Sequence, residues 1–508
     1  MSMNLGKLVC LLIKERFGDI VKQIAHYLHT HGSSPLLYIK KGTDLPLSKV
    51  KESLCVLIKY GLVSFKPNKN HNIANYTLLY DKILLIVRYP AYISLIKQKF
   101  GEETEIMLEE IIQNGYACMS EVLYKTQDRL IKEQEKNVPF TELRDKFYSL
   151  IIAKYIERVP FDADEKPVPE PTISDCQKYI QPEINIKILS EQIAGTNTNP
   201  TYPDKNIYWN INHDRFHQDM RDAQIVSAIR NKFDPEAGEV IRILLQQMYI
   251  RNEPWTHASN PIPILEVKDI IRKMNKFPNL VAFFDNYVSV VEQDCCNVIL
   301  KVGEASGGSY QINMKQIFTV LAWETIDQIV LERFGSKAAR IFRLIKAKGY
   351  IEPDNIQKFA MIPAKEAKRI SYQLLEENFV DIHELRKPMA VGAAKSFTLF
   401  HINLARVVRM VLDLCYKTMY NMLTRKFHEH EFNKRIIDKK QKVDTLLLTV
   451  KSQGAPNEQL ADIEGMISPP EREILARIEL NLEKINAVEF EIDDTIFILQ
   501  MFLAYEKE

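Results

Sequence analysis

The segment ERFGDIVKQIAHYLHTHG (Glu15–Gly32) returns later in the chain as ERFGSKAARIFRLIKAKG (Glu332–Gly349). Aligned without a gap, both copies place an apolar residue at positions 0, 4, 7 and 11 from the phenylalanine, and both end on glycine. These offsets share one face of a helix, and a terminal glycine can adopt the left-handed conformation that ends it. Each copy therefore predicts a helix whose buried face begins at Phe17 or Phe334, with a bend at the next glycine.

Two more degenerate copies follow a basic residue and a phenylalanine, at KFG (Lys99–Gly101) and KFD (Lys232–Asp234). The third copy keeps the apolar spacing, and the second departs from it only at Thr104. A spacing shared by four segments indicates an internal repeat and not four unrelated amphipathic helices.

Each copy is followed by the pattern of a second helix and an apolar pair typical of a short strand. Three copies then continue into candidate hairpin loops, namely KPNKNHN (Lys66–Asn72), GEASGG (Gly303–Gly308) and RKPMAVGAAK (Arg386–Lys395). Helix, connector, helix, strand, loop and strand within about 80 to 100 residues is the order of a winged-helix module. The second copy has no clear loop of this kind.

A chain of 508 residues exceeds the roughly 250 to 300 residues that one core usually serves, so several domains are expected. We predict a mainly α fold with small β wings, built from four tandem winged-helix modules and a C-terminal antiparallel coiled-coil hairpin. The predicted boundaries are 1–85, 86–160, 213–315 and 316–401 for the first to fourth modules, 161–212 for a linker or insertion rich in proline and acid, and 402–508 for the hairpin. The apolar end of the hairpin, DDTIFILQMFLAY (Asp493–Tyr505), should pack on a module or on a partner.

The seven cysteines are scattered without any C-x-x-C spacing, which excludes a zinc ribbon and favours a reducing compartment. The apolar run Leu8–Ile13 has no basic leader or small-residue cleavage site, and the run around Ile86 is interrupted by Arg88 and Pro90. We therefore expect an intracellular protein without a membrane anchor.

Three local patterns have some features of catalytic or metal sites. The carboxylates of DADE (Asp162–Glu165) lie among prolines, which favours a solvated acidic loop over a magnesium site. His213 and His217 have i, i+4 spacing but no intervening HExxH glutamate, so surface histidines are expected. GEASGG is neither a nucleophile elbow nor a phosphate loop. The sequence predicts no enzyme, metal or cofactor.

Winged helices that bind duplex DNA use the second helix and the wing, where Lys and Arg neutralise phosphates. The basic residues in or near those elements are Lys49, Lys51, Lys66 and Lys69 in the first module, Arg272, Lys273 and Lys276 in the third, and Lys365, Lys368, Arg369, Lys387 and Lys395 in the fourth. Acidic neighbours such as Glu52 and Glu366 dilute these clusters, and each could equally be a solvated helix face. The formal net charge of +1 favours a docking platform that contacts DNA over a repressor that reads sequence.

Several long segments resemble one known family, the third-largest, polymerase-specific subunits of eukaryotic RNA polymerase III. The matching segments are LCVLIKYGLVSF (Leu54–Phe65), GSYQINM (Gly308–Met314), ERFGSKAARIFRLI (Glu332–Ile345), FAMIPAKEAKRISYQLLEENF (Phe359–Phe379) and EIDDTIFILQ (Glu491–Gln500). The resemblance covers nearly the whole chain and is weakest across residues 161–212. The family has four winged helices and a coiled coil, as predicted above.

The resemblance implies a nuclear, non-catalytic subunit, similar to the alpha subunit of transcription factor IIE, in a trimer with two smaller polymerase III-specific subunits on the polymerase clamp. It implies recruitment to promoters carrying transcription factor IIIB, and opening or holding of duplex or single-stranded promoter DNA for small-RNA (tRNA, 5S rRNA) transcription. Nucleotide addition would belong to the two largest subunits. The competing hypothesis is a free-standing winged-helix DNA-binding transcription regulator.

Overall fold

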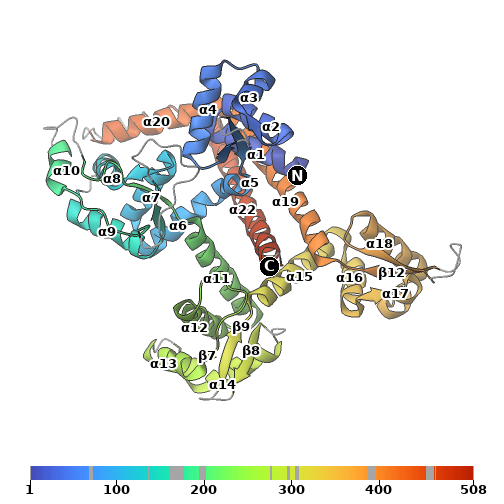
Figure 1. The fold of residues 1–508 in the computed structure, drawn as a ribbon. Helices are drawn as coiled ribbons and strands as arrows, with labels where there is room; N and C mark the ends of the chain where they lie inside the picture. The colour runs from blue at the N-terminus through green and yellow to red at the C-terminus, as the bar shows by residue number, and fades with distance from the viewer. Residues whose placement is uncertain are drawn as a thin grey trace. The chain divides into compact units, whose positions relative to one another are not determined.

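The computed structural model describes residues 2–67, 73–134, 137–160, 177–193, 202–274, 277–294, 298–303, 308–386, 396–452, 463 and 465–506 (Figure 1). Two compact units emerge from its contacts, one of Met1–Leu8 with Ile225–Glu508 and one of Val9–Gln224. Helices dominate, and the described strands form four antiparallel sheets of three strands each. None of the described helices is long and apolar enough to span a membrane.

Each sheet belongs to one winged-helix module. The first module comprises α1 (Met3–Phe17), α2 (Asp19–His31), β1 (Ser34–Pro35), α3 (Leu36–Thr43), α4 (Leu47–Lys59), β2 (Val63–Pro67) and β3 (Ala74–Leu78), with strand order β1-β3-β2. The short helices α5 (Tyr80–Leu84) and η1 (Leu85–Arg88) follow it. The fourth comprises α15 (Met314–Phe334), α16 (Ser336–Lys348), β10 (Tyr350–Ile351), α17 (Pro353–Ala360), α18 (Ala364–Glu376), β11 (Asp381–Arg386) and β12 (Ser396–His401), with order β10-β12-β11.

The first and fourth modules repeat one another in backbone detail. The difference in residue number between Glu15 and Glu332 also separates the bounds of α2, α3 and α4 from those of α16, α17 and α18. The same difference pairs residues that have a positive φ in both modules, namely Gly18 with Gly335, Gly32 with Gly349, Asp44 with Met361 and Gly61 with Asn378. The winged-helix repeat predicted from the sequence is therefore confirmed for these two modules.

The two ERFG segments lie at a junction between two helices, whereas the sequence predicted that their phenylalanines begin the buried face of a single helix. Phe17 and Phe334 end a preceding helix, α1 or α15, and do not open the next one. Gly18 and Gly335, with φ of 90° and 85°, separate the two helices of each pair. The sequence reading missed the junction because the apolar spacing of the second helix continues backwards into the last turn of the first. The rest of the predicted face is buried, as Val21, Ile24, Leu28, Ala338, Ile341 and Ile345.

The second module ends later than predicted. It comprises α6 (Tyr89–Phe100), α7 (Glu102–Asn114), β4 (Ala117–Cys118), α8 (Met119–Gln134), α9 (Phe140–Ile152), β5 (Ile156–Arg158), α10 (Ile186–Ile193) and β6 (Tyr208–Ile211). Strand β6 pairs with both β4 and β5, so the boundary predicted at residue 160 omits the central strand of the sheet. The stretch 161–212 is thus an insertion within this module, and its last residues complete the core.

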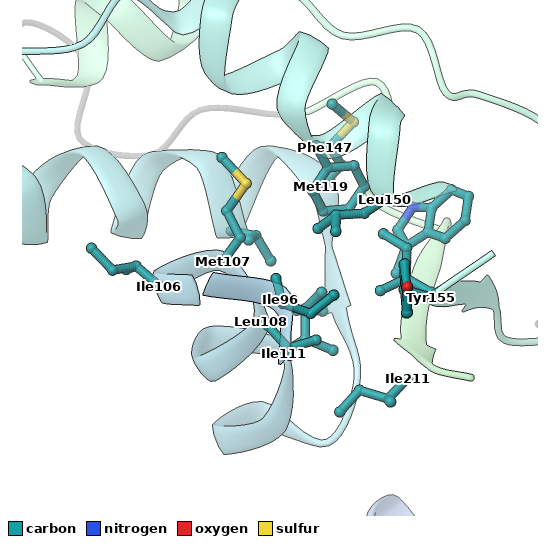
Figure 2. Close-up of a cluster of buried hydrophobic side chains, with 14 of the residues drawn as sticks. Ile96, Ile106, Met107, Leu108, Ile111, Met119, Phe147, Leu150, Tyr155 and Ile211 are labelled. Carbon is teal, nitrogen blue, oxygen red and sulfur yellow. The ribbon is translucent and has the colours of Figure 1, made fainter. Parts of the chain in front are cut away.

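The core of the second module joins side chains from before residue 161 to side chains of the insertion itself, such as Ile211 (Figure 2). Ile96, Met107, Ile111, Phe147 and Ile211 are among the buried side chains. The chain returns to this core through Asp204, whose buried carboxylate accepts hydrogen bonds from the Ser120 backbone N–H at 2.8 Å and the Ser120 hydroxyl at 2.6 Å. Because Ser120 lies in the first turn of α8, Asp204 satisfies a backbone donor that the helix cannot pair itself.

The third module comprises α11 (His213–Lys232), α12 (Pro235–Arg251), β7 (Ile262–Pro263), α13 (Ile264–Met274), α14 (Pro278–Asp294), β8 (Ile299–Gly303) and β9 (Ser309–Ile312), with order β7-β9-β8. The apolar positions predicted for α12 are buried, namely Ala237, Val240, Leu244 and Met248. The periodicity therefore found the core face of this helix even though its repeat copy is degenerate.

The C-terminal region contains α19 (Leu404–Phe432), α20 (Lys434–Ser452) and α22 (Pro469–Glu506). Ion pairs join Lys426 to Glu489 at 3.1 Å and Lys439 to Glu471 at 2.7 Å, so the segments run antiparallel as predicted. The apolar end of α22 contacts α15, where the ring of Tyr505 stacks on Phe318 with centroids 5.6 Å apart. Of the two alternatives for this end, packing on a winged-helix module is the one observed.

Candidate nucleic-acid interface

The candidate DNA-contacting residues are distributed over three modules. Lys49 and Lys51 lie on α4, Lys66 on β2, Arg272 and Lys273 on α13, and Lys365, Lys368 and Arg369 on α18. All eight side chains are exposed. Four others, Lys69, Lys276, Lys387 and Lys395, lie outside the described residues, as do DADE and most of the GEASGG loop.

The densest basic cluster lies on the N-terminal half of α18. Lys365, Lys368 and Arg369 project from the side opposite the buried Ala367, Ile370, Ser371 and Leu374. Within the described residues, no ion pair engages any of the three cations. The positive end of the helix dipole lies at the same end of α18, and it adds to their attraction for phosphate.

Two of the acids in and beside α18, Glu366 and Glu377, are paired with cations of neighbouring helices. Lys337 of α16 donates to Glu366 at 2.6 Å, and Arg333 of α15 donates to Glu377 at 2.8 Å. The sequence could not show these pairs because their partners are 29 and 44 residues apart in the chain. The N-terminal half of the exposed face of α18 is therefore more positive than its composition indicates.

The first module is a weaker candidate. The repeat register places Glu52 where the fourth module has Arg369, and Ser48 where it has Lys365. Lys49 and Lys51 remain exposed on α4, with Lys66 at the edge of the wing. This surface mixes both signs of charge, so its attraction for a polyanion is lower than that of α18.

The third module departs from the prediction. Arg272 and Lys273 lie at the end of α13, ahead of the second winged-helix helix, and Arg272 is 3.7 Å from Asp269. The second helix itself, α14, has no Lys or Arg in its sequence. It borders instead a hollow of about 330 Å³ lined by Phe233, Asp234, Ala237, Phe283, Asn286, Tyr287, Val290 and Val291. This apolar surface suits a protein contact better than a phosphate contact.

His213 and His217 are not the surface histidines that were expected. The Nε2 atom of His217 lies 3.0 Å from the Tyr92 hydroxyl and 3.3 Å from an Arg88 guanidinium nitrogen. Burial, and after it the Arg88 charge, lower the pKa of His217 to about 3. Burial and the Lys82 charge lower the pKa of His213 to about 4. Both imidazoles are therefore neutral structural groups at neutral pH.

The first turns of α11, which carry these two histidines, pack on the second module, so we expect that module to be sensitive to acid. A folded-state pKa below the unfolded value near 6.5 favours the folded form above that pH, and the advantage is lost as the pH falls toward the folded value. We expect the melting temperature to drop between about pH 6.5 and pH 4, and His217→Gln to reduce that drop. Thermal melts across this range would test it, with the exposed His31→Gln as a control. An unchanged pH profile for His217→Gln would contradict the prediction.

Comparison with known proteins matches four family models to separate parts of the chain. The RNA polymerase III subunit RPC82 helix-turn-helix domain matches residues 7–68, and the RNA polymerase III subunit RPC82 family matches 178–321. The POLR3C C-terminal winged-helix domain matches 326–402, and the helical hairpin domain of DNA-directed RNA polymerase III subunit RPC3 matches 435–498.

Full-length relatives give the same result. The DNA-directed RNA polymerase III subunits RPC3 of Rattus norvegicus and Homo sapiens are each 34% identical over 525 residues, which cover 98% of this chain and 98% of each relative. The RPC3 subunit of Danio rerio is 31% identical with the same coverage. The chain therefore belongs to the RPC3 family of RNA polymerase III subunits.

Proposed function

We propose that this chain is a non-catalytic subunit of DNA-directed RNA polymerase III that acts in transcription initiation in the nucleus. The observation that carries the proposal is the alignment of 98% of the chain with relatives named as RNA polymerase III subunit RPC3. The sequence has no nucleotide-binding fingerprint, so nucleotide addition is assigned to other subunits.

The proposed assembly is a peripheral trimer with two smaller polymerase III-specific subunits, held on the clamp of the largest subunit. There the trimer would help recruit the polymerase to promoter DNA carrying transcription factor IIIB, open that DNA, and start transcription of tRNA and 5S rRNA genes. The partly exposed α14 of the third module has no Lys or Arg and carries Phe283 and Val290 at its surface, which supports a role in protein contact. Different modules would thus serve different partners.

Direct DNA contact is proposed for the fourth module, through Lys365, Lys368 and Arg369 on α18. The exposed cations on the second helix, and the neutralisation of Glu366 by Lys337, support this assignment. In winged helices that bind duplex DNA, the corresponding helix lies in the major groove while cations hold the backbone. Lys49, Lys51 and Lys66 of the first module are assigned a weaker contact.

Affinity purification of the tagged chain from nuclear extract tests the proposal. We expect the other RNA polymerase III subunits to be recovered, with the two smaller specific subunits retained when salt removes the rest of the enzyme. Recovery of the chain without any polymerase III subunit would refute the assembly and support the free-standing regulator. A control tag on an unrelated nuclear protein sets the background.

A further inference from the structure

The hollow in the third module lies between α12 and α14, which pack side by side (Figure 1). Phe233 and Asp234, at the junction between α11 and α12, line one wall of this third-module hollow. The opposite wall is α14, where Phe283 is 57% exposed and Val290 is 44% exposed. Its volume of about 330 Å³ is near the lower end of the range for small-ligand pockets, roughly 300 to 1,000 Å³. A space of this size suits a large side chain of a partner.

Each of the other three modules packs an aromatic ring edge to face against the phenylalanine at this junction. The pairs, with the distances between their ring centroids, are Phe17 with Tyr60 at 4.9 Å, Phe100 with Tyr155 at 5.7 Å, and Phe334 with Phe379 at 5.4 Å. Such pairs stabilise a fold beyond the apolar area that they bury. Among the described residues, no aromatic ring makes a contact of this kind with Phe233. The third module therefore lacks a contact that the other three share.

A smaller residue accounts for the missing contact. The Asn212 backbone N–H donates to the carbonyl of Tyr155, just ahead of β5, and the Asn313 N–H donates to the carbonyl of Val298, just ahead of β8, both at 2.9 Å. Val298 is therefore the counterpart of Tyr155 in the sheet of the third module. It is buried, but a valine has no ring to set against Phe233. The third module thus leaves the Phe233 ring open to a ring supplied from outside.

Negative charge borders the hollow. The other three modules have glycine where the third has Asp234. Asp234 directly precedes α12, yet its side chain makes no capping hydrogen bond to that helix. Partial burial, and after it the carboxylates of Glu236 and Asp234, raise the pKa of Tyr287, which lines the hollow. Within the described part of the chain, no ion pair engages either carboxylate. The Lys232 ammonium lies 5.4 Å from the centroid of the Phe233 ring, so two carboxylates and one ammonium leave the rim negative.

We propose that the third-module hollow receives an aromatic side chain of a protein partner, from a segment that also carries a lysine or arginine. The inference rests on the proposed function, in which the third module contacts protein, and it names the chemistry of that contact. The incoming ring packs against Phe233, and the basic residue pairs with Asp234 or Glu236. Aromatic side chains in desolvated pockets are the anchors that contribute most to protein interfaces. Because carboxylates repel phosphate, this rim favours a protein over a nucleic acid.

Selection of peptides on the full chain tests the inference. The probe is a library of random dodecapeptides displayed on phage, selected on the immobilised chain and counter-selected on Val290→Phe, which fills the hollow. We expect the surviving peptides to share an aromatic residue with a nearby lysine or arginine. If no peptide survives the counter-selection, or if the survivors lack this combination, the inference is overturned.

Fluorescence anisotropy with a labelled synthetic copy of one surviving peptide then separates the two features. We expect about tenfold weaker binding to Val290→Phe, and about tenfold weaker binding to Asp234→Asn/Glu236→Gln, which removes the charges with little change of shape. Val281→Phe is the matched control, since it makes the same change at a 38% exposed residue of α14 that does not line the hollow. Equal binding by the two phenylalanine variants, or full binding by the charge variant, would contradict the proposal.

A labelled DNA duplex serves as the second ligand for the same variants. If Val290→Phe binds the peptide normally but loses affinity for the duplex, the hollow belongs to a nucleic-acid contact and the inference fails. Melting temperatures close to that of the wild-type chain show that each variant is folded. Failure of the wild-type chain to purify with the polymerase would refute the proposed function separately, because the peptide measurements use the chain without the polymerase.

Discussion

Replacing Lys365, Lys368 and Arg369 with glutamate is expected to weaken duplex DNA binding by at least about a hundredfold at low salt. Each charge-assisted contact contributes about 1.5 to 3 kcal/mol, and the new carboxylates also repel phosphate. The slope of log affinity against log salt should become shallower by about 2.7, since each phosphate contact contributes roughly 0.9. Titration of labelled duplex at several salt concentrations measures both quantities.

The same replacement should leave the melting temperature nearly unchanged, because the three side chains are exposed and none is in an ion pair among the described residues. A matched control is Lys417→Glu/Lys434→Glu/Lys442→Glu, which makes the same change in net charge at exposed positions of α19 and α20. Equal loss of binding in the control would show that only net charge matters. Loss of binding together with a large fall in melting temperature would show that the α18 variant had unfolded.

Truncating Trp209 to alanine is expected to destabilise the second module by about 3 to 5 kcal/mol. Trp209 is fully buried on β6, and its ring meets Phe147 of α9 edge to face with centroids 5.9 Å apart. Because β6 lies between β4 and β5, the loss should weaken the whole sheet and the helices packed on it. Hydrogen exchange of the amides of α7 and α9 reports this local stability within a chain of several domains.

Ile152→Ala provides the control for Trp209→Ala, since it removes a 70% exposed apolar side chain at the end of α9 in the same module. It should change amide protection by little. If Trp209→Ala leaves the protection of α7 and α9 intact, then residues 208–211 are not part of the second module's core, and of the linker and the insertion predicted for 161–212 the linker would hold.

Three errors of sequence interpretation share one cause. The junction at Phe17 and the location of Arg272 and Lys273 depend on the residues at which helices end. The burial of His217 depends on which helix packs against it. The apolar spacing reports which face of a helix is buried but not where the preceding helix stops. Likewise, i, i+4 histidines look alike in a sequence whether solvent or Tyr92 and Arg88 lie beside them.

The sequence by itself determined the repeated helices, the winged-helix order and the apolar end of the C-terminal hairpin. Each of these features follows from the spacing of apolar residues within a short segment. The repeat follows from comparing two such segments, which begin at Glu15 and Glu332. Only the tertiary structure decided that β6 closes the second module, that Lys337 neutralises Glu366, and that Met361 stands exposed in a left-handed turn. Strand pairing, ion pairing between elements and burial join residues far apart in the chain, so no local pattern can encode their partners.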